Sequence, residues 1–190
     1  MAKKLSLLLA AVAVLAFAVP AFASAAPTLQ TPGGEILKTP QAIKGTGTNV
    51  TLTSSTLGKI ICGSLNLNGT LNVNTVAAGI EGSGVNEKPE QSNCLNGTKS
   101  VIVTGVTLTN LKSTVGGTAT ASFTATVDIA ALECTFTGTN IGGTYTNGGN
   151  TLSFSEAGTI TSSPAACGTA KLDASFVLEK ANGEAIKAVF

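Results

Sequence analysis

The chain has 190 residues, a formal net charge of +1, and neither Arg nor His. Without His, it lacks the usual general base of Ser-His-Asp and Cys-His catalysis and the commonest metal ligand. Without Arg or a strong positive charge, it has little chemistry for reading nucleic acids. We therefore expect a protein that is not an enzyme, holds no cofactor or metal, and does not bind nucleic acid.

The first 25 residues have the pattern of a signal peptide. Lys3 and Lys4 precede the apolar run 5–19, and small residues with A-x-A spacing follow it. A retained membrane anchor is the alternative, but the run is shorter than the about 20 apolar residues of a spanning helix. The sequence predicts a signal peptide at 1–25 and one mature domain at 26–190. The mature chain is expected to have no membrane span and to be secreted, extracellular or on the cell surface.

Asn-Gly and Gly-Gly pairs divide the mature chain into short segments, because these residues tolerate the positive φ of tight turns. The predicted turns are Asn68-Gly69 between 64–67 and 70–76, Gly116-Gly117 between 99–111 and the segment from Thr118, Asn147-Gly148 between 144–146 and 151–155, and Asn182-Gly183 between 172–180 and 184–190. Gly105 interrupts the alternation of its own segment, which predicts a β-bulge.

Alternation of apolar and polar residues is clearest at 118–128, where Ala, Phe and Val alternate with Thr, Ser and Asp. The same period of two appears at 132–137 and 171–179, and no helical periodicity follows the signal peptide. Short alternating segments separated by turns are typical of antiparallel all-β folds. The predicted fold is a disulfide-stapled antiparallel β-sandwich, or a related barrel, of about 9 to 12 strands.

Four cysteines in an exported chain most simply form two disulfides, because export removes them from the reducing cytosol. Three pairings are possible. A repeated layout selects Cys62–Cys94 and Cys134–Cys167, whose members lie 32 and 33 positions apart. A zinc site is disfavoured, because none of these cysteines has the close spacing that zinc sites usually show.

The same layout indicates a duplicated half-domain. Segments 51–62 and 123–134 align without gaps up to a cysteine, and a similar stretch follows the second cysteine of each pair. The possible half-repeats are 48–115 and 118–190. Their identity is low, so a chance match between two β-hairpin units of similar length is the alternative.

Few side chains are candidates for chemistry. A pair of carboxylates could hydrolyse glycosides, and Asp128, at the end of the most regular segment, and Glu133, beside Cys134, are the least ordinary carboxylates. Solvated surface charges are the expected interpretation of both, because Asp and Glu are mostly exposed in proteins.

Two further features could bind a ligand. Asn86, Glu87, Glu90 and Asn93 approach the oxygen cluster of a calcium site, but Lys88 and Pro89 interrupt them, so that a plain polar loop is expected there. Sugar binding usually relies on exposed aromatic rings, and the chain has no Trp and one Tyr. Tyr145, near the Asn147 turn, is therefore the predicted ligand or partner contact.

The stretches Leu132-Glu133-Cys134-Thr135-Phe136-Thr137-Gly138 and Ser163-Pro164-Ala165-Ala166-Cys167-Gly168 resemble a group of small secreted bacterial proteins. These proteins come mostly from soil actinobacteria, carry paired cysteines and have no assigned activity. The resemblance covers most of residues 50–180. It implies an exported β-domain and transfers no functional residues.

These observations together favour a secreted or cell-surface, non-catalytic β-domain with a structural, adhesive or interaction role. Its partner would be an extracellular protein, the matrix or a cell-envelope component. One alternative is a sandwich or barrel that carries a small apolar ligand, which a large cavity lined by Ala, Val and Leu would support. A carboxylate-based hydrolase is another. An outer-membrane barrel is a further alternative, suggested by the terminal Phe190 but disfavoured by the four cysteines and the lack of aromatic girdles.

Overall fold

The computed structural model describes residues 25–113, 115–129, 131–155 and 160–190, so nearly all of the predicted signal peptide lies outside the described residues. The strands are β1 (Thr28–Gln30), β2 (Gln41–Ser54), β3 (Gly58–Thr75), β4 (Gly79–Val85), β5 (Cys94–Asn96), β6 (Lys99–Ser113), β7 (Thr118–Ile129), β8 (Leu132–Tyr145), β9 (Thr151–Ser155), β10 (Ile160–Ser163), β11 (Ala170–Lys180) and β12 (Lys187–Val189). Short 3-10 helices lie at η1 (Pro89–Ser92), η2 (Val115–Gly117) and η3 (Ala165–Cys167). No helix in this part of the chain is long and apolar enough to cross a bilayer.

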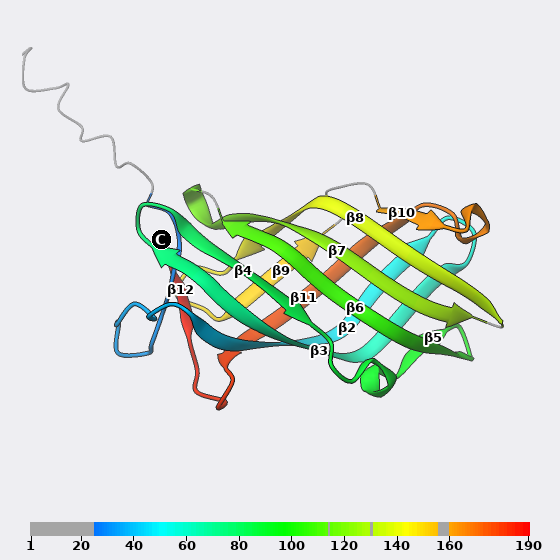
Figure 1. Cartoon of the computed structure of the whole chain (residues 1–190), viewed down its shortest axis with the longest axis horizontal. Helices are drawn as coiled ribbons and strands as arrows, with labels where there is room; N and C mark the ends of the chain where they lie inside the picture. Colours follow the sequence, from blue (N-terminus) through cyan, green and yellow to red (C-terminus); the bar gives the residue numbers. More distant parts are fainter. Residues whose placement is uncertain (1–24, 114, 130, 156–159) are drawn as a thin grey trace, which may run out of the picture.

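The long strands form a closed antiparallel barrel rather than a sandwich (Figure 1). Neighbouring strands follow the order β11, β2, β3, β4, β6, β7 and β8. Strands β9 and β10 close the circle, because each pairs with both β8 and β11. Strand β5 pairs with β3 and β6, as β4 does further along the same two strands. Of the two architectures that the sequence left open, the barrel is therefore the one observed.

The barrel consists of two units with the same pairing pattern. We call β2–β6 the first half and β7–β11 the second half. Each half begins with a hairpin of two long strands and ends with another long strand. Two short strands lie end to end between the second and third long strands: β4 and β5 between β3 and β6, and β9 and β10 between β8 and β11. The half-repeats suggested by the sequence, 48–115 and 118–190, and their origin by duplication stay predictions.

Strand β7 shows why the alternating segments form the wall. Its inward residues, which include Phe123, Ala125 and Val127, are buried, whereas the residues between them are half-buried on the outer face. Strands β8 and β11 also follow their predicted alternation. The inner face of the barrel is consequently apolar, and the outer face is rich in Thr, Ser and Asn.

Asparagine bulges shift this alternation in three long strands. Asn49, Asn110 and Asn140 have φ values of 54°, 52° and 54°, a left-handed conformation that Asn adopts more readily than most residues. Pairing shifts register beside each of them, in β2–β11, β6–β7 and β7–β8. A further shift between Val103 and Gly105 confirms the bulge predicted at Gly105.

Three of the four predicted turns lie between strands, at Gly116-Gly117, Asn147-Gly148 and Asn182-Gly183. The turn predicted at Asn68-Gly69 is wrong, because β3 runs straight through this pair. Asn68 pairs with Lys44 on one side and Val85 on the other. Gly69 is needed there for a different reason, since a Cβ at this position would collide with the backbone of Ser83.

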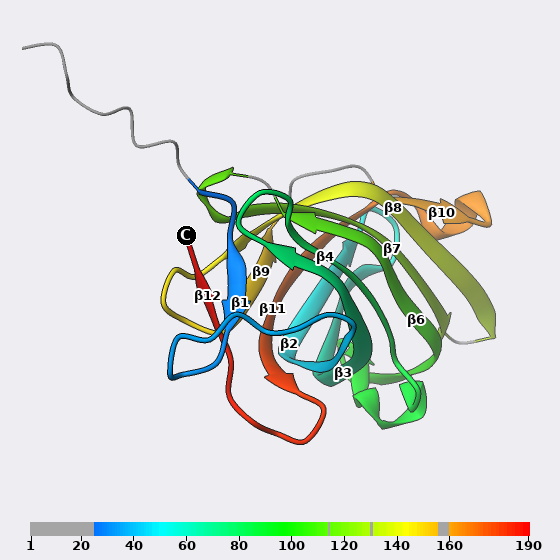
Figure 2. The ribbon, with the colours of Figure 1, turned by 60° about the vertical axis from the view of Figure 1, so that its left-hand side comes forward.

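The two ends of the described chain close one end of the barrel. Strands β1 and β12 pair antiparallel across this end, as Figure 2 shows. The side chain of Asn74, near the end of β3, is buried there, where its Nδ2 donates to the Leu29 and Leu37 carbonyls at 2.7 and 3.0 Å and its Oδ1 accepts from the Leu29 amide at 2.7 Å. In the second half, the exposed Asn147 side chain bonds the backbone N and O of Phe190 at 3.3 and 3.1 Å.

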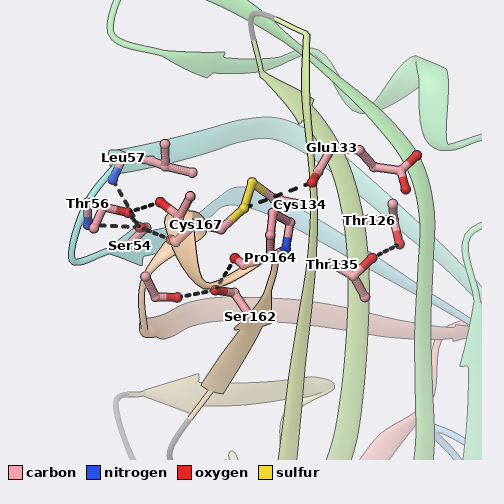
Figure 3. Close-up of a disulfide and its surroundings, with 12 residues drawn as sticks. Ser54, Thr56, Leu57, Thr126, Glu133, Cys134, Thr135, Ser162, Pro164 and Cys167 are labelled. Atoms are coloured by element: carbon pink, nitrogen blue, oxygen red, sulfur yellow. Dashed lines mark hydrogen bonds between the residues drawn. A yellow bond between two sulfur atoms is a disulfide. The ribbon is translucent and has the colours of Figure 1, made fainter.

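Strand β5, which carries Cys94, lies toward the other end of the barrel (Figure 1). The disulfides are formed by four cysteines, two in each half. They join Cys62 to Cys94 and Cys134 to Cys167, the pairing that the spacing predicts. The first connects directly opposed residues of β3 and β5, whereas the second connects β8 to η3 (Figure 3). Next to the second disulfide, the buried Ser54 hydroxyl donates to the Cys167 carbonyl at 2.6 Å, which ties the β2–β3 turn to η3.

Candidate functional site

The interior of the barrel is filled by apolar side chains. Two small cavities remain, of about 40 and 30 Å³. The first lies among Leu67, Phe154 and Phe176, and the second lies between Val50 and Phe123. These volumes are far below the roughly 300 to 1,000 Å³ of pockets that hold drug-sized ligands. Each of these two cavities is therefore too small for a lipid-sized molecule.

The two candidate carboxylates lie on the outer wall. Asp128 of β7 stands directly opposite Glu133 of β8, so the barrel brings together two residues that the sequence separated by a turn. Asp128 is half-buried, Glu133 is exposed, and neither lines either interior cavity. Like charges directly opposite each other in a sheet repel. This arrangement resembles a solvated pair at the surface more than the enclosed acid and base of a glycosidase.

Two members of the candidate calcium cluster, Asn86 and Glu87, bond to other side chains. The Asn86 amide donates to the Ser92 hydroxyl at 3.0 Å, and its Oδ1 accepts the backbone N–H of Lys88 at 2.9 Å. The Glu87 carboxylate turns toward Asn68 at 2.9 Å. Within the described ranges, no group of three or more His, Cys, Asp or Glu side chains is placed to hold a metal ion.

Tyr145 lies inside the barrel wall, with 5% of its surface exposed. Burial raises the pKa of its phenol well above the ordinary value. Its hydroxyl finds no hydrogen-bond partner among the described residues. The ring therefore offers no exposed platform, and contact between Tyr145 and an external partner would need a rearrangement of the barrel.

The largest hollows lie on the outer wall of the first half, over β3, β4 and β6. Three adjoining hollows, of about 260, 420 and 540 Å³, follow one another along β4, and we call them together the outer groove. Asn68 and Glu87 line both the first and second hollows, and Ser83 lines both the second and third. The hollows therefore adjoin one another along the strand.

Glycines lie on the inner side of the wall beneath the outer groove. Gly69 and Gly84 form a directly opposed pair between β3 and β4, and Gly82 lies two residues before Gly84. A Cβ on Gly82 would lie 2.8 Å from the Thr70 carbonyl oxygen, so the strands approach too closely there for a side chain. The residues between these glycines face outward, and Ser83 is exposed on the groove side of β4.

The lining of the groove is polar and mixed in charge. At one end are Lys44, Asn66, Lys88 and Gln91, together with the bonded pair of Asn68 and Glu87. At the other end, Lys112 forms an ion pair with Glu81 at 3.1 Å. The whole lining carries three Lys against two Glu, which is close to balance, so the groove suits a neutral polar molecule better than a polyanion or an apolar segment.

The outer groove was not predicted from the sequence, although two local signals point to it. One is the run 66–72, in which Asn66, Asn68, Thr70 and Asn72 carry polar groups at alternate positions. The other is the Gly-x-Gly pattern at 82–84. The run was divided by the turn predicted at Asn68-Gly69, which concealed one continuous polar face.

No protein-family model matches this chain, and no curated protein or solved structure matches it.

Proposed function

We propose that this protein is an exported, non-catalytic β-barrel that makes contact with extracellular material through its outer wall. The observation that carries the proposal is the contrast between a filled interior, with cavities of about 40 and 30 Å³, and an outer groove whose hollows reach about 540 Å³. Its partner would be an extracellular protein, the matrix or a component of the cell envelope.

Two further features support this proposal. The disulfides Cys62–Cys94 and Cys134–Cys167 are consistent with an oxidising, extracellular environment, where such bonds form and persist. The absence of His from the sequence removes most common catalytic arrangements, and Asp128 and Glu133 stand on the outer wall without an enclosing cleft. A disulfide-bonded scaffold that contacts its partner through surface side chains needs none of these catalytic arrangements.

The proposal can be tested by co-sedimentation of the purified mature protein with insoluble cell-envelope and matrix fractions. We expect the protein to sediment with at least one fraction and to release no soluble sugar or peptide from it. Release of soluble product would support the hydrolase alternative instead. Failure to sediment with every fraction would contradict the contact function.

The apolar-ligand carrier is a second candidate, favoured by the mainly apolar lining of the interior cavities. Native mass spectrometry of the protein purified from its producing cells distinguishes it. An extra mass of lipid size, lost on denaturation, would move this candidate to first place. The bare mass of the chain with two disulfides is the result that the contact function predicts.

A further inference from the structure

The outer groove of the first half is lined mainly by amide, hydroxyl and charged side chains. We propose that it binds a neutral polysaccharide chain. This inference rests on the proposed function, because it names the class of extracellular partner that the outer wall contacts.

The groove contains polar side chains that are available to hydrogen-bond to a ligand. The side chains of Asn66, Thr70 and Ser83 project into it and have no hydrogen-bond partner among the described residues. On the corresponding strand of the second half, the Ser153 hydroxyl is satisfied by Ser175 at 2.8 Å. Sugar hydroxyls both donate and accept hydrogen bonds, so they can match amides and hydroxyls of either polarity.

The positive charges of the groove are nearly balanced by negative charges, which favours a neutral ligand. Each Lys of the groove has a carboxylate close by: Glu81 binds Lys112 at 3.1 Å, and Glu179 stands opposite Lys44 across the β2–β11 pair. Lys88 lines the same hollow as Glu87. A polyanion would bring its charges against these carboxylates, whereas a neutral chain can hydrogen-bond to lysines and carboxylates alike.

The backbone of β4 is not available to pair with an extended peptide, which is the main alternative ligand. Strand β4 is paired with β3 along one edge and with β6 along the other. An extended peptide that bound by strand addition would need a free edge, which β4 does not offer. The groove also lacks the aromatic platforms and Arg side chains with which proteins hold single-stranded nucleic acids.

The continuity of the groove predicts how binding depends on chain length. Each hydrogen bond to a sugar replaces one to water, so a single sugar without an aromatic ring beneath it should bind weakly. The hollows share Asn68, Glu87 and Ser83, so a longer chain can occupy all of them at once. Affinity should therefore rise with the number of sugar units.

The test is an NMR titration of the ¹⁵N-labelled mature protein with cellohexaose, maltohexaose and the matching disaccharides. We expect at least one hexaose to shift the backbone amides of Thr70, Ser83 and Thr109 selectively, and to bind at least about tenfold more tightly than its disaccharide. Hexa-galacturonate, which has the same number of units, serves as the acidic probe and should bind more weakly than the neutral hexaose.

Variants locate the site. Ser83→Tyr places a bulky ring in the middle of the groove and should weaken hexaose binding by at least about tenfold. Thr137→Tyr makes the same kind of change at an exposed position on β8, in the second half, and should leave binding unchanged. Thr109→Tyr blocks the groove from β6 and serves in case Ser83→Tyr does not fold.

The proposal is overturned if neither hexaose shifts any amide, if the shifted amides lie outside the groove, or if the acidic probe binds more tightly. The co-sedimentation assay separates this failure from failure of the proposed function. If Ser83→Tyr still sediments with envelope or matrix fractions as the unmodified protein does, the groove is not the contact site but the contact function stands.

Discussion

The two halves of the barrel share a strand pattern but fill the interior in different ways. The second half supplies the buried aromatic residues of the wall, including Phe136, Phe154 and Phe176. The first half, 41–113, contains no aromatic residue and supplies Leu, Ile and Val together with glycines on its inner face. The ring of Phe176 lies against Gly47, which is its direct partner across the β2–β11 pair.

This difference shows that the halves are complementary rather than interchangeable. Large residues of one half occupy space that glycines of the other leave open, so the closed core depends on both. The halves differ at their disulfides as well, since Cys134 and Cys167 are both fully buried, whereas in the first half Cys94 is buried and Cys62 is only partly buried. The following experiments test these differences, from the largest expected effect to the smallest.

Removing the disulfide of the second half should destabilise the protein more than removing that of the first. The two disulfides close loops of nearly equal length, at 32 and 33 residues. Removing either one gives the unfolded chain a similar gain in entropy, which should lower the free energy of unfolding by about 3 to 4 kcal/mol. Cys134→Ala/Cys167→Ala also removes two fully buried sulfurs that pack in the core, which should add about 1 kcal/mol.

Denaturant unfolding of both double variants measures this difference. The Cys62→Ala/Cys94→Ala variant is the matched control, because β3 and β5 remain paired at those positions. Equal losses in the two variants would show that burial of the sulfurs contributes nothing beyond the crosslink.

Asn74→Ala should loosen the closed end of the barrel more than Asn147→Ala. Asn74 is buried and makes three hydrogen bonds to β1 and the segment after it, whereas Asn147 is exposed and makes two longer ones to Phe190. We expect losses of about 2 to 3 kcal/mol for Asn74→Ala, because backbone groups are left buried and unpaired, and below about 1 kcal/mol for Asn147→Ala.

Hydrogen exchange of the Leu29 amide gives the local measurement, together with the free energy of unfolding. Asn74→Ala should speed exchange at Leu29, and Asn147→Ala should leave it nearly unchanged. Similar effects of the two variants would mean that the two chain ends leave the barrel together rather than independently.

Gly47→Ala should disturb the contact between the halves. A Cβ at this position would lie 2.8 Å from Phe176 Cε1 and 2.8 Å from Val50 Cγ2, which predicts a loss of about 1 to 3 kcal/mol from overpacking. Gly45→Ala is the matched control, because its Cβ would have its nearest contact at 3.5 Å from Leu178, an ordinary distance. We expect this control to change stability by less than about 0.5 kcal/mol.

A double-variant cycle measures the contact itself. Phe176→Leu should cost less stability in the Gly47→Ala background than in the unmodified protein, because the shorter side chain relieves the clash. Additive losses in the free energy of unfolding would show that the Phe176 ring moves away from the added Cβ at no cost, so that Phe176 does not require Gly47.

The smallest effect is expected at the turn after β11. The hydrogen bond from Lys180 lowers the pKa of the exposed Glu184 carboxyl, at an Nζ–Oε2 distance of 2.8 Å. A carboxyl with a lowered folded-state pKa stabilises the protein above its unfolded pKa, and this contribution is lost as the pH falls through the folded value. Lys180→Ala should raise the pKa of Glu184 toward its ordinary value.

Carboxyl NMR titration checks this shift. Lys112→Ala, which breaks the ion pair of the first half, should leave the pKa of Glu184 unchanged. An unchanged Glu184 titration in the Lys180→Ala variant would contradict the role of this hydrogen bond.

The sequence by itself determined the features that depend on neighbours along the chain. Alternation at 118–128 specified the strand β7, Asn147-Gly148 and Gly116-Gly117 specified turns, and the spacing of four cysteines specified their pairing. These features follow from side-chain period, backbone sterics and repeated spacing, which are all visible in a single chain.

Only the tertiary structure decided the closure of the sheet and the position of the groove. A period of two is the same in a sandwich and a barrel, and the choice depends on β9 and β10 pairing with both β8 and β11. The same long-range pairing turned Asn68-Gly69 from an apparent turn into the middle of β3, and buried Tyr145. An Asn-Gly pair permits a turn, but two flanking strands that pair with it keep it extended, which no local signal reports.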